Sequence, residues 1–322
     1  MDGSLFFVDL TAPPLLFFLL GVTAAVVKSD LELPPALAKF LSLYLLFAIG
    51  FKGGVALAES ELDGEAWQVL GTAVALAGTL PILVFYLLRR WLDAANAAAV
   101  AATYGSVSAV TFVTATAYLD AQGIAWGGHL VAAMALMESP AIIVGVLLYR
   151  AHSRADQSTP LSVVHMLREA CFGGPVLLIL GSLVIGCVTG SRGMSSLAPF
   201  VQALFPGMLC FFLLDMGIVA ARRLVDLKRL GPVVPVFALA FPLVSGCGTA
   251  LLTSMLGFAQ GNAVLLAVLA ASASYIAVPA SMRLALPQAN PSVYVPMAIG
   301  ITFPFNIAFG IPVYPAVVGY LG

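Results

Sequence analysis

The stretch "LAASASYIAVPASMR", residues 269–283, places three serines, a tyrosine, a proline and an arginine inside an otherwise apolar segment. It follows the run "NAVLLAVLAA" (262–271) and leads into "LALPQANPSVYV" (284–295). A helix needs roughly 20 apolar residues to cross the bilayer core, where unpaired backbone groups are costly. Polar and helix-breaking residues in such a segment therefore require a specific reason, and we interpret the stretch as half of a transport site.

The composition is that of a polytopic integral membrane protein. Of the 322 residues 61% are hydrophobic and only 9% are charged, with a mean hydropathy of +1.05, whereas soluble domains carry about 25% charged residues. The net charge of −1 disfavours nucleic-acid binding, which needs a basic surface. The four cysteines lack metal-ligand spacing. The spans also contain no hydrolase or metalloprotease motif, so we expect no enzyme and no resident metal.

Apolar runs between charged or Pro/Gly-rich breaks predict ten membrane-spanning segments. Their approximate bounds are 13–28, 35–57, 66–89, 94–119, 126–149, 169–189, 197–221, 232–257, 262–286 and 292–320. With the N-terminus outside, the inner loops receive all of the 14 basic residues except Lys52 and Arg192, and the acidic stretch "AESELDGEA" (58–66) falls outside. The positive-inside rule therefore predicts that both termini lie outside.

Five spans on each side of a central loop give two halves of opposite topology, which is typical of inverted-repeat transporters. The predicted organisation is a first five-span repeat (1–149), a cytoplasmic connector (150–168) and a second, inverted five-span repeat (169–322). We thus expect an all-α membrane protein built as a 5+5 inverted repeat, with breaks at corresponding places in spans four and nine.

Spans four and nine do show similar interruptions. Span four reads "ATYGSVSAVTFVTATAYLDAQG" (102–123), and a constant offset of 168 residues places Gly105 on Ala273, Ser106 on Ser274 and Thr111 on Pro279. Glycine and proline both disfavour a continuous helix. The amides and hydroxyls left at such breaks need a partner, which water or a bound anion supplies. The alternative is that the small residues serve only close helix packing.

Three charged residues fall inside predicted spans, where an isolated charge is costly. "FKGGVA" (51–56) aligned with "LDMGIV" (214–219) sets Lys52 opposite Asp215 and Gly54 on Gly217. Either Lys52 and Asp215 form an ion pair, or both extend to the membrane surface. Glu138, in "LMESPAII" (136–143), either binds a cation or proton or is hydrogen-bonded to neighbouring helices.

Several motifs resemble the sodium-dependent bicarbonate transporter family, SbtA type. They are "YGSVSAVT" (104–111), "MESPAIIV" (137–144), "SASYIAVPASMR" (272–283), "LPQANPSVYV" (286–295), "FPFNIAFGIPVY" (303–314), "GFKGGVAL" (50–57) and "REACFGGPVLLILGSLVIG" (168–186). The resemblance implies a ten-span inverted repeat in the inner membrane of a bacterium, a homotrimer surrounded by lipid, and a core domain that moves against a gate domain. It also implies sodium as the coupling ion and a PII-like cytoplasmic regulator, for which the 150–168 loop is a candidate site.

Carried over residue by residue, the resemblance implies an anion site formed by the two breaks. The first half-site is Gly105, Ser106, Val107, Ser108 and Thr111, and the second is Ser272, Ser274, Tyr275, Ile276 and Pro279. Backbone amides and the hydroxyls of Ser106, Ser108 and Ser274 would donate hydrogen bonds to a small monovalent anion. Glu138, Lys52 and Asp215 remain the candidates for coupling-ion or charge-pair roles.

The chain departs from the family at positions that concern the ion. Ala273 and Tyr275 replace part of a serine-rich run followed by aspartate, Ala277 and Val278 replace serine and glycine, Glu138 replaces an aspartate, and Ala298 and Ile299 replace a Ser-Thr pair. We therefore expect a secondary transporter of bicarbonate or a similar small anion with elevator-like alternating access. The alternatives are a proton-linked or passive anion permease, and a non-transporting membrane sensor with a degenerate site.

Overall fold

The computed structural model describes residues 13–59, 64–153, 174–227, 231–275 and 277–321, and these residues are helical with short links and no strand. Among them, eight helical stretches are long and apolar enough to cross a membrane. Two of the ten predicted spans are absent from those eight. These are predicted spans one and nine. The structure has the short apolar helix α1 (Pro13–Val26) at span one, and α11 (Gln260–Ala271) and α12 (Ala277–Ala285) at span nine.

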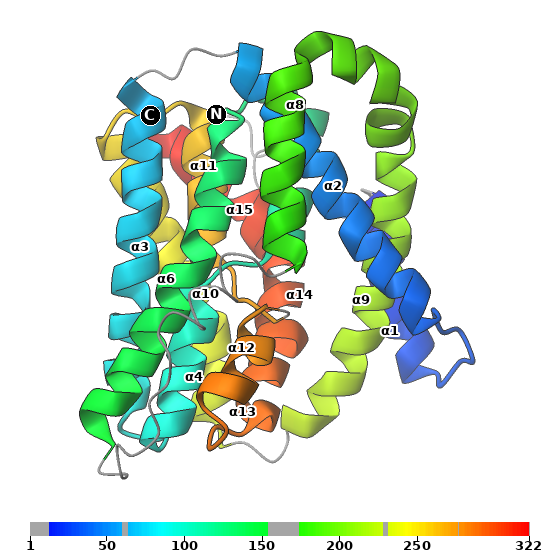
Figure 1. Cartoon of the computed structure of the whole chain (residues 1–322). Helices are drawn as coiled ribbons and strands as arrows, with labels where there is room; N and C mark the ends of the chain where they lie inside the picture. Colours follow the sequence, from blue (N-terminus) through cyan, green and yellow to red (C-terminus); the bar gives the residue numbers. More distant parts are fainter. Residues whose placement is uncertain (1–12, 60–63, 154–173, 228–230, 276, 322) are drawn as a thin grey trace.

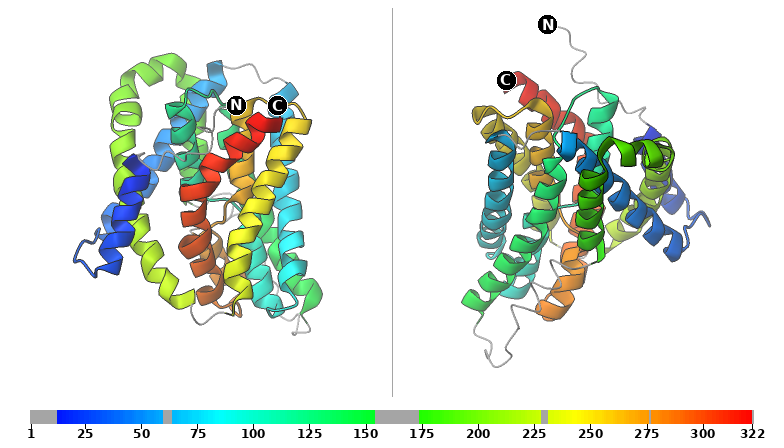
Figure 2. Two further views of the ribbon diagram at one scale, coloured as in Figure 1. Left: turned by 180° about the vertical axis from the view of Figure 1, so that it is seen from behind. Right: turned by 45° about the horizontal axis from the view of Figure 1, so that its top comes forward.

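The helices pack in two groups (Figure 1). In group 1, α2 packs against α8 and α1 packs against α9. Apart from α1, the helices of group 1 are α2 (Pro35–Glu59), α8 (Gly174–Ala198), the π-helical η2 (Pro199–Ala203) and α9 (Phe205–Leu227). Group 2 contains all other elements, in which α3, α4 and α6 pack together and α10 packs beside α11 and α15 (Figure 2). Its remaining bounds are α3 Gly64–Leu88, α4 Ala94–Gly105, α5 Ala109–Ala121, α6 His129–His152, α10 Val233–Met255, α13 Pro291–Pro296, η3 Met297–Thr302, α14 Phe303–Phe305, η4 Asn306–Gly310 and α15 Ile311–Leu321.

Glycines allow the group 1 helices to approach each other closely. A Cβ on Gly21 of α1 would lie 2.1 Å from the Leu214 carbonyl oxygen of α9, and one on Gly217 of α9 would lie 2.1 Å from the Phe18 oxygen of α1. Small residues at such crossings are a common way to pack helices in membranes, where no hydrophobic force draws helices together. The α1·α9 pair is thus fixed by reciprocal glycine–backbone contacts.

The α2·α8 pair repeats this arrangement. A Cβ on Gly54 of α2 would lie 2.0 Å from the Leu183 oxygen, and one on Gly186 of α8 would lie 2.3 Å from the Phe51 oxygen. Gly217 and Leu214 follow Gly54 and Phe51 by 163 residues each. Gly186 and Leu183 likewise follow Gly21 and Phe18 by 165 residues each. The alignment of Gly54 with Gly217 proposed from the sequence therefore joins two residues that make the same kind of contact.

The predicted start of span seven needs correction, whereas that of span six lies outside the described residues. Residues 154–173 lie outside the described part, so the predicted start of span six at 169 and most of the 150–168 connector are not described. Gly190 inside α8 has φ 52° and ψ −144°, a positive φ that suits glycine. The chain bends there and runs across the upper edge of Figure 1, so α9 begins at Phe205 rather than at 197.

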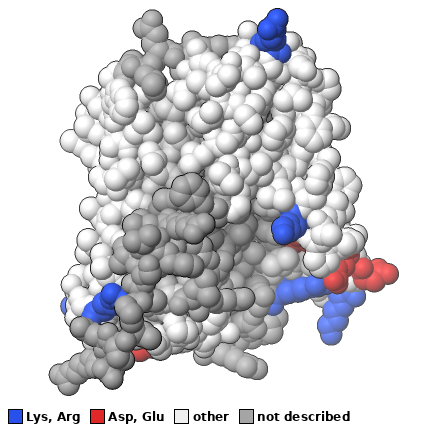
Figure 3. Space-filling view, in the orientation of Figure 1, with Lys and Arg blue, Asp and Glu red and all other residues white. Residues whose placement is uncertain are grey.

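Basic residues gather at one end of the molecule. The start of α2, the end of α3 and the end of α6 lie at the lower end in Figure 1, and they carry Lys39, Arg89, Arg90 and Arg150. On the face drawn in Figure 3, most of the Lys and Arg side chains lie in the lower half, and one lies at the top. The other end, where α3 begins and α5 finishes, carries Glu65 and Asp120.

Candidate functional site: the crossing of two interrupted segments

Two helical segments are interrupted where they meet inside group 2. α4 ends at Gly105 and α5 begins at Ala109, while α11 ends at Ala271 and α12 begins at Ala277. The links bind each other: the Ser108 amide donates to Ser272 Oγ at 2.9 Å, and the Ser274 amide donates to the Thr103 carbonyl at 2.9 Å. These bonds place the two predicted half-sites in contact.

The register between the two segments differs from the expected constant offset. α4 and α11 are both 12 residues long. Their last residues, Gly105 and Ala271, are 166 positions apart in the sequence. The starts of α5 and α12 are 168 residues apart, because the second link is two residues longer. The pairing of Gly105 with Ala273 was therefore wrong: Gly105 corresponds to Ala271, and the C-cap residue Ser106 corresponds to the C-cap residue Ser272.

The N-termini of α5 and α12 both lie at this crossing. Ser108 caps α5 by accepting a bond from the Thr111 amide at 3.2 Å, and Ser274 Oγ accepts one from the Val278 amide at 3.3 Å. The amides of Ala109 and Val110 occupy the first turn of α5, where a helix provides no acceptor. Pro279 lies in the first turn of α12, where proline is tolerated. Helix N-termini carry partial positive charge, so both starts favour an anion at the crossing.

Gly105 has a packing role at the end of α4. A Cβ at this position would lie 2.1 Å from Cγ of Pro81, which is inside α3. The absence of a side chain lets the end of α4 rest directly on α3. Its contribution to the site is therefore to position the link that follows it.

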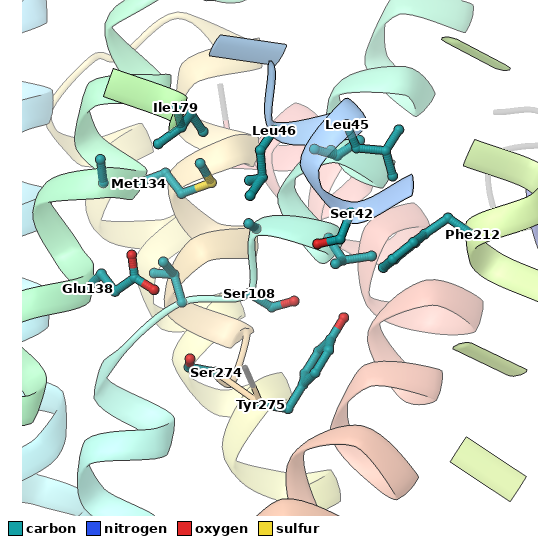
Figure 4. A pocket seen from close by; sticks show the side chains of 15 residues that line it. Ser42, Leu45, Leu46, Ser108, Met134, Glu138, Ile179, Phe212, Ser274 and Tyr275 are labelled. Atoms are coloured by element: carbon teal, nitrogen blue, oxygen red, sulfur yellow. The ribbon is translucent and has the colours of Figure 1, made fainter. Parts of the chain in front are cut away.

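A cavity of about 60 Å³ lies between the crossing and group 1 (Figure 4). The crossing contributes Val107, Ser108, Ala109, Val110, Val113, Ser274 and Tyr275, α6 contributes Met134, Ala135 and Glu138, and group 1 contributes Ser42, Leu45, Leu46, Ile179 and Phe212. A water needs about 10–15 Å³ of such volume. The cavity therefore has room for a small ion with a few waters.

Three buried hydroxyls at the crossing lack a hydrogen-bond partner. Ser106 Oγ and Thr111 Oγ1 belong to residues that are 1% exposed, and the third is the hydroxyl of Tyr275, which interacts with the Ser108 side chain without the geometry of a full hydrogen bond. The Tyr275 ring packs on Phe303 with 5.5 Å between ring centroids, and its hydroxyl points toward the side of the cavity that holds Ser42 and Ser108 (Figure 4). Buried polar groups are normally paired. Unpaired hydroxyls on neighbouring residues are typical of a site that receives an ion or water.

Glu138 directs its carboxylate toward the cavity from α6 (Figure 4). No lysine, arginine or histidine lines the cavity in the described part of the chain. Nor does a hydrogen bond or ion pair join this carboxylate to another described residue. Of the two interpretations of Glu138, the structure offers no support for the hydrogen-bonded structural carboxylate and leaves room for a cation or proton.

The proposed ion pair between Lys52 and Asp215 is not formed. Lys52 Nζ instead lies 3.0 Å from Oδ2 of Asp120, at the end of α5. Asp215, on α9, is 8% exposed and makes no hydrogen bond or ion pair with a described residue. Lys52 and Asp215 therefore approach different neighbours: Lys52 lies beside the end of α5, and Asp215 lies within α9.

Sequence reasoning missed the group 1 side of the cavity. Ser42 and Phe212 lie in regular apolar helices and carry no local signal of a site. Of the predicted residues, Val107, Ser108, Ser274, Tyr275 and Glu138 line the cavity. Ile276 lies outside the described residues. No cluster of three His, Cys, Asp or Glu side chains suited to a metal ion occurs among the described residues.

Comparison with known proteins gives one assignment. The family model of the Na+-dependent bicarbonate transporter superfamily matches residues 13–319, which is nearly the whole chain. No individual curated protein matches the chain significantly.

Proposed function

Because this chain belongs to the Na+-dependent bicarbonate transporter superfamily, we propose that it is a secondary active transporter of bicarbonate or a similar small monovalent anion, coupled to Na+. The observation that carries the proposal is the cavity at the crossing of the two interrupted segments. It combines two helix N-termini with buried hydroxyls and contains no basic side chain among its described lining residues.

The anion binds, in this proposal, at the start of α5. The free amides of Ala109 and Val110 and the hydroxyls of Ser108 and Tyr275 are donors that face or line the cavity. Hydrogen bonds from neutral donors and a helix dipole stabilise one negative charge without a fixed counter-ion. A neutral site of this kind releases its anion more readily than an arginine clamp would.

The cation binds through oxygen atoms close by. Glu138 lines the cavity and supplies a carboxylate, and the unpaired hydroxyls of Ser106 and Thr111, which belong to the crossing but not to the cavity lining, supply further oxygens for Na+. Hard cations prefer oxygen ligands. Coupling then arises because the cation offsets the anion's charge, so each ion strengthens the binding of the other.

A second candidate is proton coupling, which the isolation of Glu138 favours. A carboxylate without a described partner in a membrane-embedded cavity either takes up a proton or binds a cation. A proton-linked permease would use the same anion site, but its uptake would follow the pH gradient rather than the sodium gradient.

We further propose ten membrane crossings in a 5+5 inverted repeat, with elevator-like movement of group 2 against group 1. The matched glycine contacts of α1·α9 and α2·α8 support the repeat. The basic residues at the end of the molecule opposite the start of α3 support an orientation with that basic end inside. The trimer and the PII-like regulator stay predictions.

Ligand binding tests the proposal without requiring transport. The purified chain is heated in detergent with bicarbonate and either Na+ or K+, and its Tm is compared with that in chloride. A ligand that binds the folded state stabilises it by an amount that grows with the ratio of ligand concentration to Kd, so we expect a higher Tm only when bicarbonate and Na+ are both present. Tyr275→Phe should weaken this shift, and an identical shift with chloride would contradict an anion site.

A further inference from the structure

One ion pair joins the two helix groups at the end of the molecule where α5 finishes. Lys52 Nζ, on α2 of group 1, lies 3.0 Å from Asp120 Oδ2, on α5 of group 2. The other salt bridge found among the described residues, Arg222–Glu32, lies near the basic end and involves residues of α9 and of the link between α1 and α2. Only the Lys52–Asp120 pair would therefore have to break if the groups moved apart.

Each partner is also held within its own group. Trp126 Nε1 donates to Asp120 Oδ1 at 2.9 Å, so the second carboxylate oxygen is fixed by group 2. Nζ of Lys52 lies 5.3 Å from the ring centroid of Phe205, on α9 of group 1, within the range of a cation–π interaction. If the ion pair opens, both side chains keep one partner, so its opening leaves neither charge isolated.

The ion pair lies between the cavity and one end of the molecule. On α2, Lys52 lies six positions after the cavity residue Leu46. On α5, Asp120 lies seven positions after the cavity residue Val113. With 1.5 Å per helical residue, both helices place the pair about 10 Å from the cavity. Close contact of Gly53 on α2 with Val131 on α6 adjoins it. These contacts join the two groups between the cavity and the end of the molecule that carries Glu65 and Asp120.

The matching position of the other repeat shows the opposite state. Lys52 corresponds to Asp215 through the same 163-residue relation that joins Gly54 to Gly217, and Asp120 corresponds to Gln288 through the 168-residue relation of α5 and α12. Asp215 makes no bond with a described residue, and Gln288 is exposed. An ion pair thus joins the groups at one end, whereas no ion pair between described residues joins them at the counterpart position, where α9 packs on η3 and α13.

We propose that the Lys52–Asp120 pair is a gate that closes the acidic-end entrance of the cavity in this state and opens once in every transport cycle. The inference rests on the alternating access proposed above. The strength of the Lys52–Asp120 ion pair suits this role. The two side chains are 21% and 43% exposed, and partly exposed ion pairs are weak enough to break and reform readily. Lys52 and Asp120 are positioning residues, since neither lines the cavity.

Side-specific labelling of the cavity tests the gate. Ser42→Cys is placed in the full chain with its four native cysteines replaced by alanine, and a membrane-impermeant maleimide is added separately to each side in cells and in inverted vesicles. The labelling rate reports access to the cavity and does not require transport. Lack of bicarbonate uptake would therefore overturn the proposed function while leaving this measurement interpretable.

The expected result is faster labelling from the acidic-end side when either charge is removed. Lys52→Gln and Asp120→Asn should each raise that rate about two- to fivefold, the range set by the strength of partly exposed ion pairs. Lys52→Arg, which keeps the positive charge, should keep the native rate. The matched control is Arg222→Gln, which breaks the pair with Glu32 and should change nothing.

Two results would overturn the gate. One is an equal labelling rate in the native chain, in Lys52→Gln and in Asp120→Asn. The other is the same rise in Arg222→Gln, because general loosening of the fold would then explain the access.

Discussion

At the scale of single residues, the crossing contains hydroxyls whose presence folding alone does not explain. An unsatisfied buried polar group costs about 1–3 kcal/mol, so evolution for stability would replace it by an apolar group. Thr111 and Thr116 illustrate the difference, because both lie on α5 and both are 1% exposed. Thr116 Oγ1 donates to the Val113 carbonyl at 2.9 Å, whereas Thr111 Oγ1 has no partner.

This contrast gives the first prediction. Thr111→Val should leave the Tm unchanged or raise it, because the isosteric methyl removes an unpaired oxygen. The same change should weaken Na+-dependent uptake about 10- to 100-fold, since a bond to a charged group contributes about 1.5–3 kcal/mol. Thr116→Val, the matched control, should preserve uptake. Equal uptake by the two variants in proteoliposomes would refute a ligand role for Thr111.

Glu138 gives the second prediction. Glu138→Gln keeps the size of the side chain but removes the charge, so we expect anion binding to persist while its dependence on the coupling cation is lost. Glu138→Asp retains a carboxylate and should retain part of that dependence. Uptake measured against sodium and against pH gradients separates the two cations. Unchanged ion dependence in Glu138→Gln would reject its coupling role.

At the scale of helices, the fold depends on close approach between α1 and α9 and between α2 and α8. Adding a methyl group at Gly54 or Gly217 would bring Cβ to about 2 Å from a backbone oxygen of the partner helix. Backbone atoms cannot move aside as a flexible side chain can, so the helices must separate. Overpacking of this kind typically costs about 1–3 kcal/mol.

The third prediction follows. Gly54→Ala and Gly217→Ala should lower the Tm by similar amounts, because a Cβ at either position would come equally close to a backbone oxygen of the partner helix. Gly181→Ala, on α8, is the control: nothing lies within 4 Å of its Cβ, and alanine favours a helix more than glycine does. Thermal unfolding in detergent measures all three. A tolerated Gly217→Ala beside a damaging Gly54→Ala would contradict the equivalence.

Some of this element-level arrangement was predictable from the sequence. The small and polar stretches at residues 105–108 and 272–279 marked where α4, α5, α11 and α12 end and begin, because glycine, serine and proline act locally on the backbone. The two-residue difference between the links was not predictable, since ungapped alignment hides it. The predicted end of span six at residue 189 agrees with the bend at Gly190, whereas the separate helical course of residues 191–203 after the bend was not predicted.

The contacts between distant residues were the least predictable part. Lys52 and Asp120 are 68 positions apart, and only the packing of group 1 against group 2 brings them together. The alignment of the two halves suggested Asp215 instead, because a sequence alignment gives no distance between the aligned residues. Ser42 and Phe212 joined the site for the same reason, since they belong to the opposing helix group.

At the scale of the whole molecule, two groups of helices enclose a small cavity between them, and the family assignment covers nearly the full chain. Such a cavity serves transport if the groups alternate between states that open it to either side. The ion pair of Lys52 with Asp120 across the groups, and the lack of an ion pair between Asp215 and a described residue, are consistent with one such state.

The most direct test of sodium-coupled anion transport is uptake of radiolabelled bicarbonate into proteoliposomes at fixed pH. Three conditions are compared: an inward Na+ gradient, equal Na+ on both sides, and an inward K+ gradient of the same size. The account predicts accumulation above equilibrium only with the inward Na+ gradient, and its loss in Thr111→Val. Uptake that merely equilibrates, at the same rate in all three conditions, would contradict it.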